Sequence, residues 1–193
     1  MNHTDEEIIT GVRESIADVM KIPIDEVKLD SVLTEDLEAV SIDFVDIMFH
    51  LESKFQVTFH SGNPLDRIAE SVGPESVIRQ GALTGFGVEV VHRRMPEIVS
   101  SVVTPGMPAG NVQALYTTAT WVRTVKELLE ARPKSCPSCG SDSLRPLRPS
   151  ILLCDGCKSE VKCPTQAEIL TTWAKEEFGS PPDRRHVESR AGS

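Results

Sequence analysis

The pattern of apolar and polar positions predicts a helix near the beginning of the chain. Four apolar side chains recur every four residues and form one stripe, as in an amphipathic helix: Ile8, Val12, Ile16 and Met20. Thr4 and Glu7 have the spacing of a capping box, which marks the start of the helix, and Pro23 ends it. The connection over residues 22–40 is rich in aliphatic side chains, so we expect it to pack on the domain.

A second helix is predicted to begin at Ser41, whose hydroxyl is a favourable N-terminal cap. Its apolar stripe consists of Phe44, Met48, Leu51 and Phe55. Its polar side consists of Asp43, Asp46, His50 and Lys54. A further helix is predicted from about Thr118 to Ala131, and the apolar residues on one of its faces are Trp121, Val125 and Leu128.

Residues 61–112 have a different pattern, because glycines and prolines interrupt every periodic stretch. Short helical turns are predicted around residues 64–71 and 88–94. A segment of about fifty residues without a function of its own is uncommon in a compact domain. Residues 1–132 are therefore interpreted as one mainly helical domain with an insertion at about residues 61–112.

The C-terminal part divides into three short segments. Residues 133–164 contain all five cysteines. Thr165 and Glu168 form another capping box, and the apolar spacing after it predicts an amphipathic helix over residues 165–178. The polar residues 179–193 are expected to be disordered.

The charge is distributed unevenly along the chain. Residues 1–60 carry 14 acidic and 4 basic side chains, whereas residues 61–193 carry 15 acidic and 16 basic ones. An acidic N-terminal part argues against nucleic acid as its partner and favours proteins with basic docking surfaces. The chain has no apolar run of about 18 residues and begins without a basic, apolar leader, so we expect no membrane span and a cytoplasmic location.

The cysteines form two C-x-x-C knuckles, and a fifth cysteine stands apart from them. Turns of this kind direct two thiolates at one point, so two of them supply the four sulfurs of a tetrahedral Zn²⁺. The predicted ligands are Cys136, Cys139, Cys154 and Cys157. The knuckles and the predicted strands between them resemble a zinc ribbon, with a structural Zn²⁺ and a free thiol at Cys163. The absence of an aromatic stacking platform among the nearby basic side chains disfavours nucleic-acid binding.

The twelve residues from Asp36 to Ile47 carry a more specific signal. They read Asp-Leu-Glu-Ala-Val-Ser-Ile-Asp-Phe-Val-Asp-Ile. This stretch resembles the acyl carrier protein family, whose usual pattern is an acidic residue and Leu, then Gly-x-Asp-Ser-Leu-Asp at the start of an acidic helix. The run over residues 41–49 is similar to carriers of very long acyl chains in lipid A synthesis. The sequence departs from the family pattern at Glu38, Val40 and Ile42, where the family has Gly, Asp and Leu.

The resemblance covers about residues 4–60 and 113–131, and it implies both a fold and a function. The implied fold is an acyl-carrier-like bundle of three main helices and one short one, here followed by the zinc ribbon and a short helix. The implied function is that of a carrier, not an enzyme, which holds acyl groups as thioesters on a 4'-phosphopantetheine arm attached to Ser41. The implied docking residues are Asp36, Glu38, Asp43 and Asp46. The implied partners are a phosphopantetheinyl transferase and acyl-processing enzymes such as synthases and acyltransferases, in fatty acid, lipid or polyketide-like biosynthesis.

Two questions stay open at the level of sequence. One alternative to the carrier is a zinc-ribbon interaction module whose helices are never modified; another is a nucleic-acid-binding ribbon protein, which the charge disfavours. The insertion also has two interpretations. Its apolar residues could extend the interior and shelter a longer acyl chain, or its surface could dock one dedicated partner enzyme.

Overall fold

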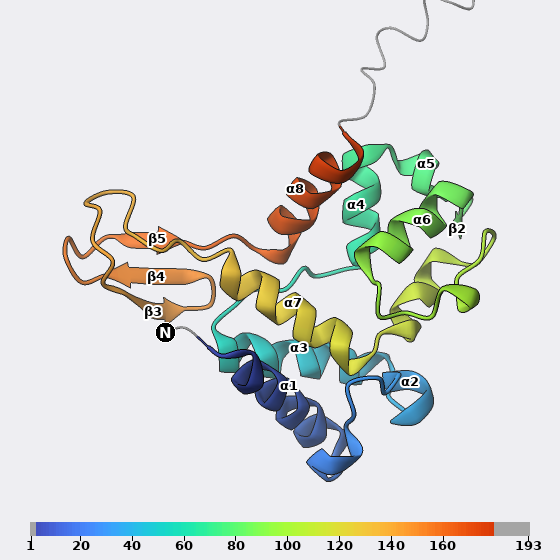
Figure 1. Ribbon diagram of the computed structural model, residues 1–193, viewed down its shortest axis with the longest axis horizontal. Coiled ribbons are helices and arrows are strands. Elements are labelled where there is room, and N and C mark those ends of the chain that lie inside the picture. The colour runs from blue at the N-terminus through green and yellow to red at the C-terminus, as the bar shows by residue number, and fades with distance from the viewer. Residues whose placement is uncertain (1–2, 180–193) are drawn as a thin grey trace, which may run out of the picture.

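The computed structural model describes residues 3–179, and in this range the fold is mainly helical with a small antiparallel sheet (Figure 1). The predicted fold class is therefore confirmed. The tail beyond residue 179, which the sequence predicts to be disordered, lies outside the described residues. None of the helices in the described range is long and apolar enough to cross a membrane.

Three long helices form the bundle. They are α1 (Asp5–Met20), α3 (Ser41–Phe55) and α7 (Thr118–Glu130), and each contacts the other two. Their apolar stripes meet in a common core, in which Ile16, Ile47 and Leu128 are almost completely buried. The predicted capping box of α1 is present, because the Thr4 side chain accepts a hydrogen bond from the Glu7 amide and the Thr4 amide donates one to the Glu7 carboxylate.

The connection between α1 and α3 packs on the bundle. It contains the short helices η1 (Ile24–Glu26) and α2 (Leu33–Asp36), and it buries Val27 and Leu33 completely. The Arg13 side chain on α1 donates hydrogen bonds to two of its carbonyls, those of Ile24 and Val27. Buried apolar side chains and satisfied carbonyls together hold this long connection in one position.

The insertion between α3 and α7 folds into its own set of short elements. These are α4 (Pro64–Val72), α5 (Pro74–Val77), β1 (Ile78–Arg79), β2 (Ala82–Leu83), α6 (Gly85–Arg94), η2 (Ser100–Val102) and η3 (Ala109–Leu115). β1 and β2 pair as a small antiparallel hairpin. Most apolar residues of this segment are buried among these elements and continue the core of the bundle, whereas Val99 and Val102 are exposed.

The last helix, α8 (Gln166–Phe178), returns to the helical domain after the ribbon. It packs on α4 of the insertion and on α7, and it contributes Leu170 and Ala174 to the shared core. Phe178 at its end lies edge-on to Phe86 of α6, with ring centroids 5.1 Å apart. The helix is therefore a packing partner of the insertion, a role that its separate position in the sequence does not reveal.

Buried ion pairs join the insertion to α7. Arg94 on α6 is bonded through its guanidinium to the carboxylate of Glu127, and Arg123 is paired with both Glu97 and Glu127. Burial by itself would raise the pKa of Glu127, but the hydrogen bonds and charges of Arg94 and Arg123 outweigh it and hold that pKa below its ordinary value. The four charged side chains thus form one compensated network.

Residues 133–164 form a separate three-stranded antiparallel sheet beside the bundle (Figure 1). Its strands, in order, are β3 (Leu144–Arg148), β4 (Ile151–Cys154) and β5 (Glu160–Lys162). Its base is fixed to the chain just after α3, because the Arg132 side chain and the Ser150 amide both donate to the Gln56 carbonyl. In the view of Figure 1 this sheet and the α5–α6 part of the insertion lie on opposite sides of α7.

Candidate functional site

Ser41 occupies the first turn of α3 and is exposed to solvent. The structure corrects its predicted capping role: the cap position is Val40, whose amide donates to the Asp43 carboxylate at 2.8 Å. Because Asp43 already closes this end of the helix, the Ser41 hydroxyl is available for chemistry. A phosphodiester formed at that hydroxyl would lie near the free amides and the positive end of the α3 dipole.

The acidic residues around Ser41 have local structural roles as well as charge. The Asp36 carboxylate accepts a hydrogen bond from the Val32 amide at 2.7 Å, much as Asp43 does for Val40. Asp46 is exposed on α3 and Glu38 is exposed in the preceding loop. Together with Asp36 they surround the serine with negative charge on a solvent-facing surface.

One departure from the family pattern is Glu38, which stands where the family has glycine. Its backbone has a φ of 55°, in the left-handed region that glycine adopts without steric cost. The turn before Ser41 therefore needs the conformation for which a glycine is the usual choice. In this chain a glutamate adopts it, so the loop geometry is kept at some cost in conformational free energy.

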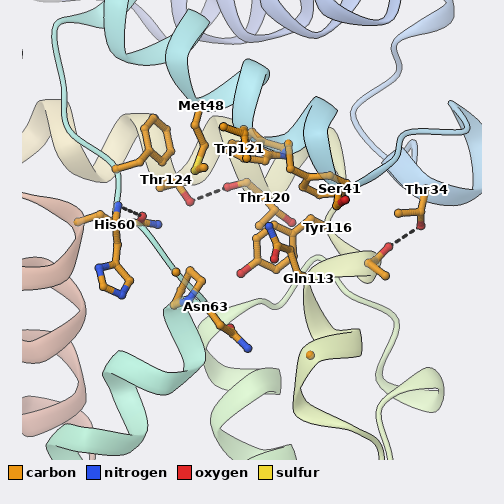
Figure 2. A pocket seen from close by; sticks show the side chains of 18 residues that line it. Thr34, Ser41, Met48, His60, Asn63, Gln113, Tyr116, Thr120, Trp121 and Thr124 are labelled. Carbon is orange, nitrogen blue, oxygen red and sulfur yellow. Dashed lines mark hydrogen bonds between the residues drawn. The ribbon is translucent and has the colours of Figure 1, made fainter.

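A cavity of about 470 Å³ opens beside Ser41. In Figure 2, Ser41 and Thr34 lie toward one side of it and His60 lies toward the other. The lining comes mainly from α3, from residues 59–64 that follow it, from η3 and from α7, with Thr34 of α2, Tyr116 and Gln166 of α8 completing it. The insertion contributes only its two ends to this lining, including Asn63 and Gly110, while most of its apolar residues pack against each other and α8.

Four aromatic side chains form part of the cavity wall. Trp121 of α7 is the central one, with ring centroids 6.1 Å from Phe44, 5.7 Å from Phe59 and 6.2 Å from Tyr116. Phe44 and Trp121 are apolar-face residues of their helices, so the helical periodicity indicates that they are buried. It does not indicate that they border an open space, because that depends on the packing of three separate segments.

Next to Ser41, α3 exposes apolar side chains that sequence reasoning missed. Ile42 and Phe49 are 60% and 63% exposed, Val45 between them is 37% exposed, and Val40 precedes the helix at 59%. Ile42, Val45 and Phe49 follow one another at i, i+3 and i+7, so they share one face of the helix. That spacing is the available signal in the sequence, but the predicted core stripe of this helix, Phe44, Met48, Leu51 and Phe55, does not include these residues.

The structure brings the four predicted cysteine ligands together. The sulfurs of Cys136, Cys139, Cys154 and Cys157 all lie within 4.8 Å of one another, with Cys136–Cys157 at 3.7 Å and Cys139–Cys154 at 3.6 Å. A tetrahedral Zn²⁺ with Zn–S bonds of about 2.3 Å places its sulfurs about 3.8 Å apart. The donor set and its spacing therefore fit this ion.

The surroundings favour the thiolate form, which is the form that binds metal, at two of the four cysteines, Cys136 and Cys157. At Cys139 the Ser141 amide lowers the pKa, but hydrogen bonding with the Cys157 and Cys154 sulfurs outweighs it and raises that pKa to about 12. The Ser159 hydroxyl lies 3.5 Å from the Cys136 sulfur and 3.0 Å from the Cys157 sulfur. Hydrogen bonding from Ser159 lowers the pKa of both thiols. Cys163 is not part of the cluster; it is buried in the core of the sheet, and burial raises its pKa.

Comparison with known proteins agrees with the motif around Ser41. The chain is 34% identical over 58 residues to an acyl carrier protein of Beutenbergia cavernae, covering 71% of that protein and 30% of this chain. It is 42% identical over 55 residues to an acyl carrier protein of Petrotoga mobilis, covering 65% of that protein and 28% of this chain. On this similarity the chain belongs to the acyl carrier protein family.

The similarity has clear limits. The chain spans about two thirds of the length of the two curated relatives, and these matches cover less than a third of the chain itself. No family model matches the chain, and no solved structure matches it. More than two thirds of the residues of this chain therefore lie outside the regions matched to these relatives.

Proposed function

We propose that this protein carries acyl intermediates as thioesters on a 4'-phosphopantetheine arm attached to Ser41. The observation that carries the proposal is the position of Ser41: exposed, in the first turn of an acidic helix and at the mouth of a cavity. The arm would supply a flexible thiol that forms the thioester with the acyl group. The protein would present that group to other enzymes and would not itself catalyse a reaction.

The surface around Ser41 supports transient docking of partner enzymes. Asp36, Glu38, Asp43 and Asp46 would attract a phosphopantetheinyl transferase and acyl-processing enzymes that have basic docking surfaces, which favours fast association. The exposed face of Ile42, Val45 and Phe49 would add apolar contact in the same interface. We place this activity in a specialised fatty acid, lipid or polyketide-like pathway of the cytoplasm.

The mass of the intact protein tests the proposal. Co-expression with a phosphopantetheinyl transferase should add one phosphopantetheine to the chain, and Ser41→Ala should abolish this gain completely while the helical circular dichroism is preserved. Ser53→Ala is the matched control, because Ser53 is also exposed on α3. A mass gain that persists in Ser41→Ala would contradict the proposal. A wild-type chain that is never modified would favour the alternative, an interaction module that bears no arm.

The four-cysteine cluster is proposed to hold one structural Zn²⁺. Four thiolates complete a tetrahedral shell and leave no open position for a substrate, so the ion would stabilise the sheet. Metal content per chain should be lost in Cys136→Ser and Cys154→Ser and retained in Cys163→Ser. Equal loss in all three variants would show that this ligand set is wrong.

A further inference from the structure

A short segment after α3 runs from the base of the cysteine sheet to the cavity beside Ser41. It consists of residues 56–60 and belongs to no helix or strand. Its last two residues, Phe59 and His60, line the cavity, and Figure 2 shows His60 across the cavity from Ser41. Because backbone groups outside regular elements need partners elsewhere, the donors and acceptors around this segment decide where that wall of the cavity lies.

The sheet and its linker hold the first residue of the segment. The Gln56 carbonyl accepts hydrogen bonds from the Ser150 amide at 3.1 Å and from the Arg132 side chain at 2.9 Å. Ser150 is buried in the turn between β3 and β4, and its own carbonyl accepts a bond from the Cys163 amide at 2.8 Å. This turn of the sheet is therefore bonded to the bundle on one side and to the end of β5 on the other.

Gln166, the first residue of α8, holds the other end of the segment. Its amide donates to the Thr58 carbonyl at 3.2 Å, and its side-chain oxygen accepts a bond from the His60 amide at 2.8 Å. Gln166 is 7% exposed and itself lines the cavity. Only Pro164 and Thr165 separate it from Cys163 in the core of the sheet, so the folded sheet restricts where Gln166 lies.

The Phe59 amide is held in a different way. It donates to the Glu52 carboxylate of α3 at 2.7 Å, so its partner belongs to the bundle. The cavity wall thus has one residue fixed by α3 and a neighbouring one, His60, fixed through the helix that follows the sheet.

A sheet with so small an apolar core depends on bound metal for its fold. We propose that Zn²⁺ at the four cysteines regulates the carrier site: the metal-loaded sheet holds Gln56 and Gln166 in place, and loss of the metal releases the His60 side of the cavity wall. This inference rests on the proposed carrier function and zinc site, and it adds the concentration of free Zn²⁺ as a regulator of the carrier. The ion acts in this way because it binds the folded sheet and not the unfolded one.

Amide hydrogen exchange of the full chain, measured by NMR with one Zn²⁺ bound and again after removal of the metal with EDTA, tests the inference. We expect the His60 amide to exchange about threefold to tenfold faster without metal, the factor for one net hydrogen bond, while the Phe59 amide keeps its rate. Unchanged exchange at His60 would overturn the inference. Equal acceleration at His60 and Phe59 would also overturn it, because it would indicate a general loosening of the fold.

Trp121 reports on the cavity itself, because it lines the cavity and is only 4% exposed. The chain has two tryptophans, so Trp173→Phe leaves Trp121 as the single one. In this variant the quenching of Trp121 fluorescence by acrylamide should rise when Zn²⁺ is removed, since the quencher can enter where the wall has opened. Quenching that is the same with and without metal would contradict the release of the wall.

A variant of the connecting residue tests the route. Gln166→Ala removes the acceptor for the His60 amide and changes no cysteine, so it should keep one Zn²⁺ per chain and show fast His60 exchange with or without the metal. Thr172→Ala is the matched control, because Thr172 is exposed on the same helix, and it should keep the dependence on zinc. Zinc-dependent His60 exchange in Gln166→Ala would overturn the route. Metal content and the mass gain at Ser41 test the two underlying proposals separately, so a chain that passes both and lacks the zinc dependence would refute this inference alone.

Discussion

The helical domain and the cysteine sheet are stabilised by different means. The helical domain has a continuous apolar core that includes Ile16, Leu51, Leu65 and Leu128, each at most 1% exposed. The core of the sheet consists of Leu152, Val161 and three cysteines, with Leu144 at its edge. An apolar core this small stabilises a fold poorly. The comparison indicates that burial holds the helical domain, and we propose that metal–thiolate bonds hold the sheet.

The two regions share one short segment, residues 56–60. The Gln56 carbonyl accepts hydrogen bonds from Arg132 and Ser150 on the sheet side, and the Thr58 carbonyl accepts one from the Gln166 amide at the start of α8. Phe59 and His60, the two residues that follow Thr58, line the cavity beside Ser41. The sheet is therefore positioned to fix part of the cavity wall.

The largest expected effect is the loss of the sheet when metal is removed. Zinc binding contributes about 10–16 kcal/mol to the folding of comparable small zinc modules. With a strong chelator, amides of residues 136–163 should lose protection from hydrogen exchange, including that of Ser150, while most of the helical circular dichroism remains. The Cys163→Ser protein should respond to the chelator like the wild type. Protected sheet amides in metal-free protein would show that the small apolar core suffices.

Removal of a buried side chain from the bundle core should have the opposite effect: it should destabilise the helical domain and leave the metal site of the sheet unchanged. Leu51→Ala removes a fully buried side chain of α3, so it should lower the free energy of unfolding by about 3 kcal/mol. Urea unfolding followed by circular dichroism measures this loss, and the metal content should stay at the wild-type value. Phe49→Ala on the same helix is the control, because its side chain is 63% exposed and its effect should stay within about 0.5 kcal/mol.

The ion network that joins the insertion to α7 should give a smaller, pH-dependent effect. Glu127→Gln should destabilise the protein by about 2 kcal/mol at pH 7, because it leaves the buried guanidinium of Arg94 without its charge partner, while Arg123 keeps Glu97. The folded-state pKa of Glu127 lies below the ordinary value of 4.5, so its contribution is complete above that pH and is lost as the pH falls through the folded pKa.

The difference between wild type and Glu127→Gln should therefore vanish in strong acid. Thermal unfolding at pH 7, 5 and 3 measures it, with Glu130→Gln as the control because Glu130 is exposed on the same helix. A difference that is constant over this pH range would show that the carboxylate charge of Glu127 does not stabilise the fold.

The smallest expected effects concern residues with left-handed backbone conformation, and one long side chain from each region is compared: Glu38 of the helical domain and Lys158 of the sheet. Glu38 has a φ of 55° and Lys158 a φ of 62°, so Glu38→Gly and Lys158→Gly should each stabilise their own region by about 1 kcal/mol. Gly140 follows the first knuckle as Lys158 follows the second, with a φ of 73° and open space around it. Gly140→Ala should therefore destabilise the sheet, and unchanged unfolding in all three variants would argue against conformational strain.

The local elements of this protein follow from short-range patterns in its sequence. The four-residue spacing from Ile8 to Met20 and the capping boxes at Thr4 and Thr165 depend on neighbours within one helix turn, so α1 and α8 could be predicted from the chain alone. The two C-x-x-C knuckles likewise depend on short turns, and the structure places their four sulfurs together. The motif around Ser41 indicated the family, which the comparisons support.

The way in which these elements combine depends on contacts between distant parts of the chain. The capping role passed from Ser41 to Asp43, because the helix start is set by the loop that precedes it. The cavity depends on the distance between α3, α7 and the ends of the insertion. The return of α8 onto α4 joins residues about 100 positions apart. Contacts of this kind have no local pattern, since either partner alone shows only an ordinary amphipathic helix.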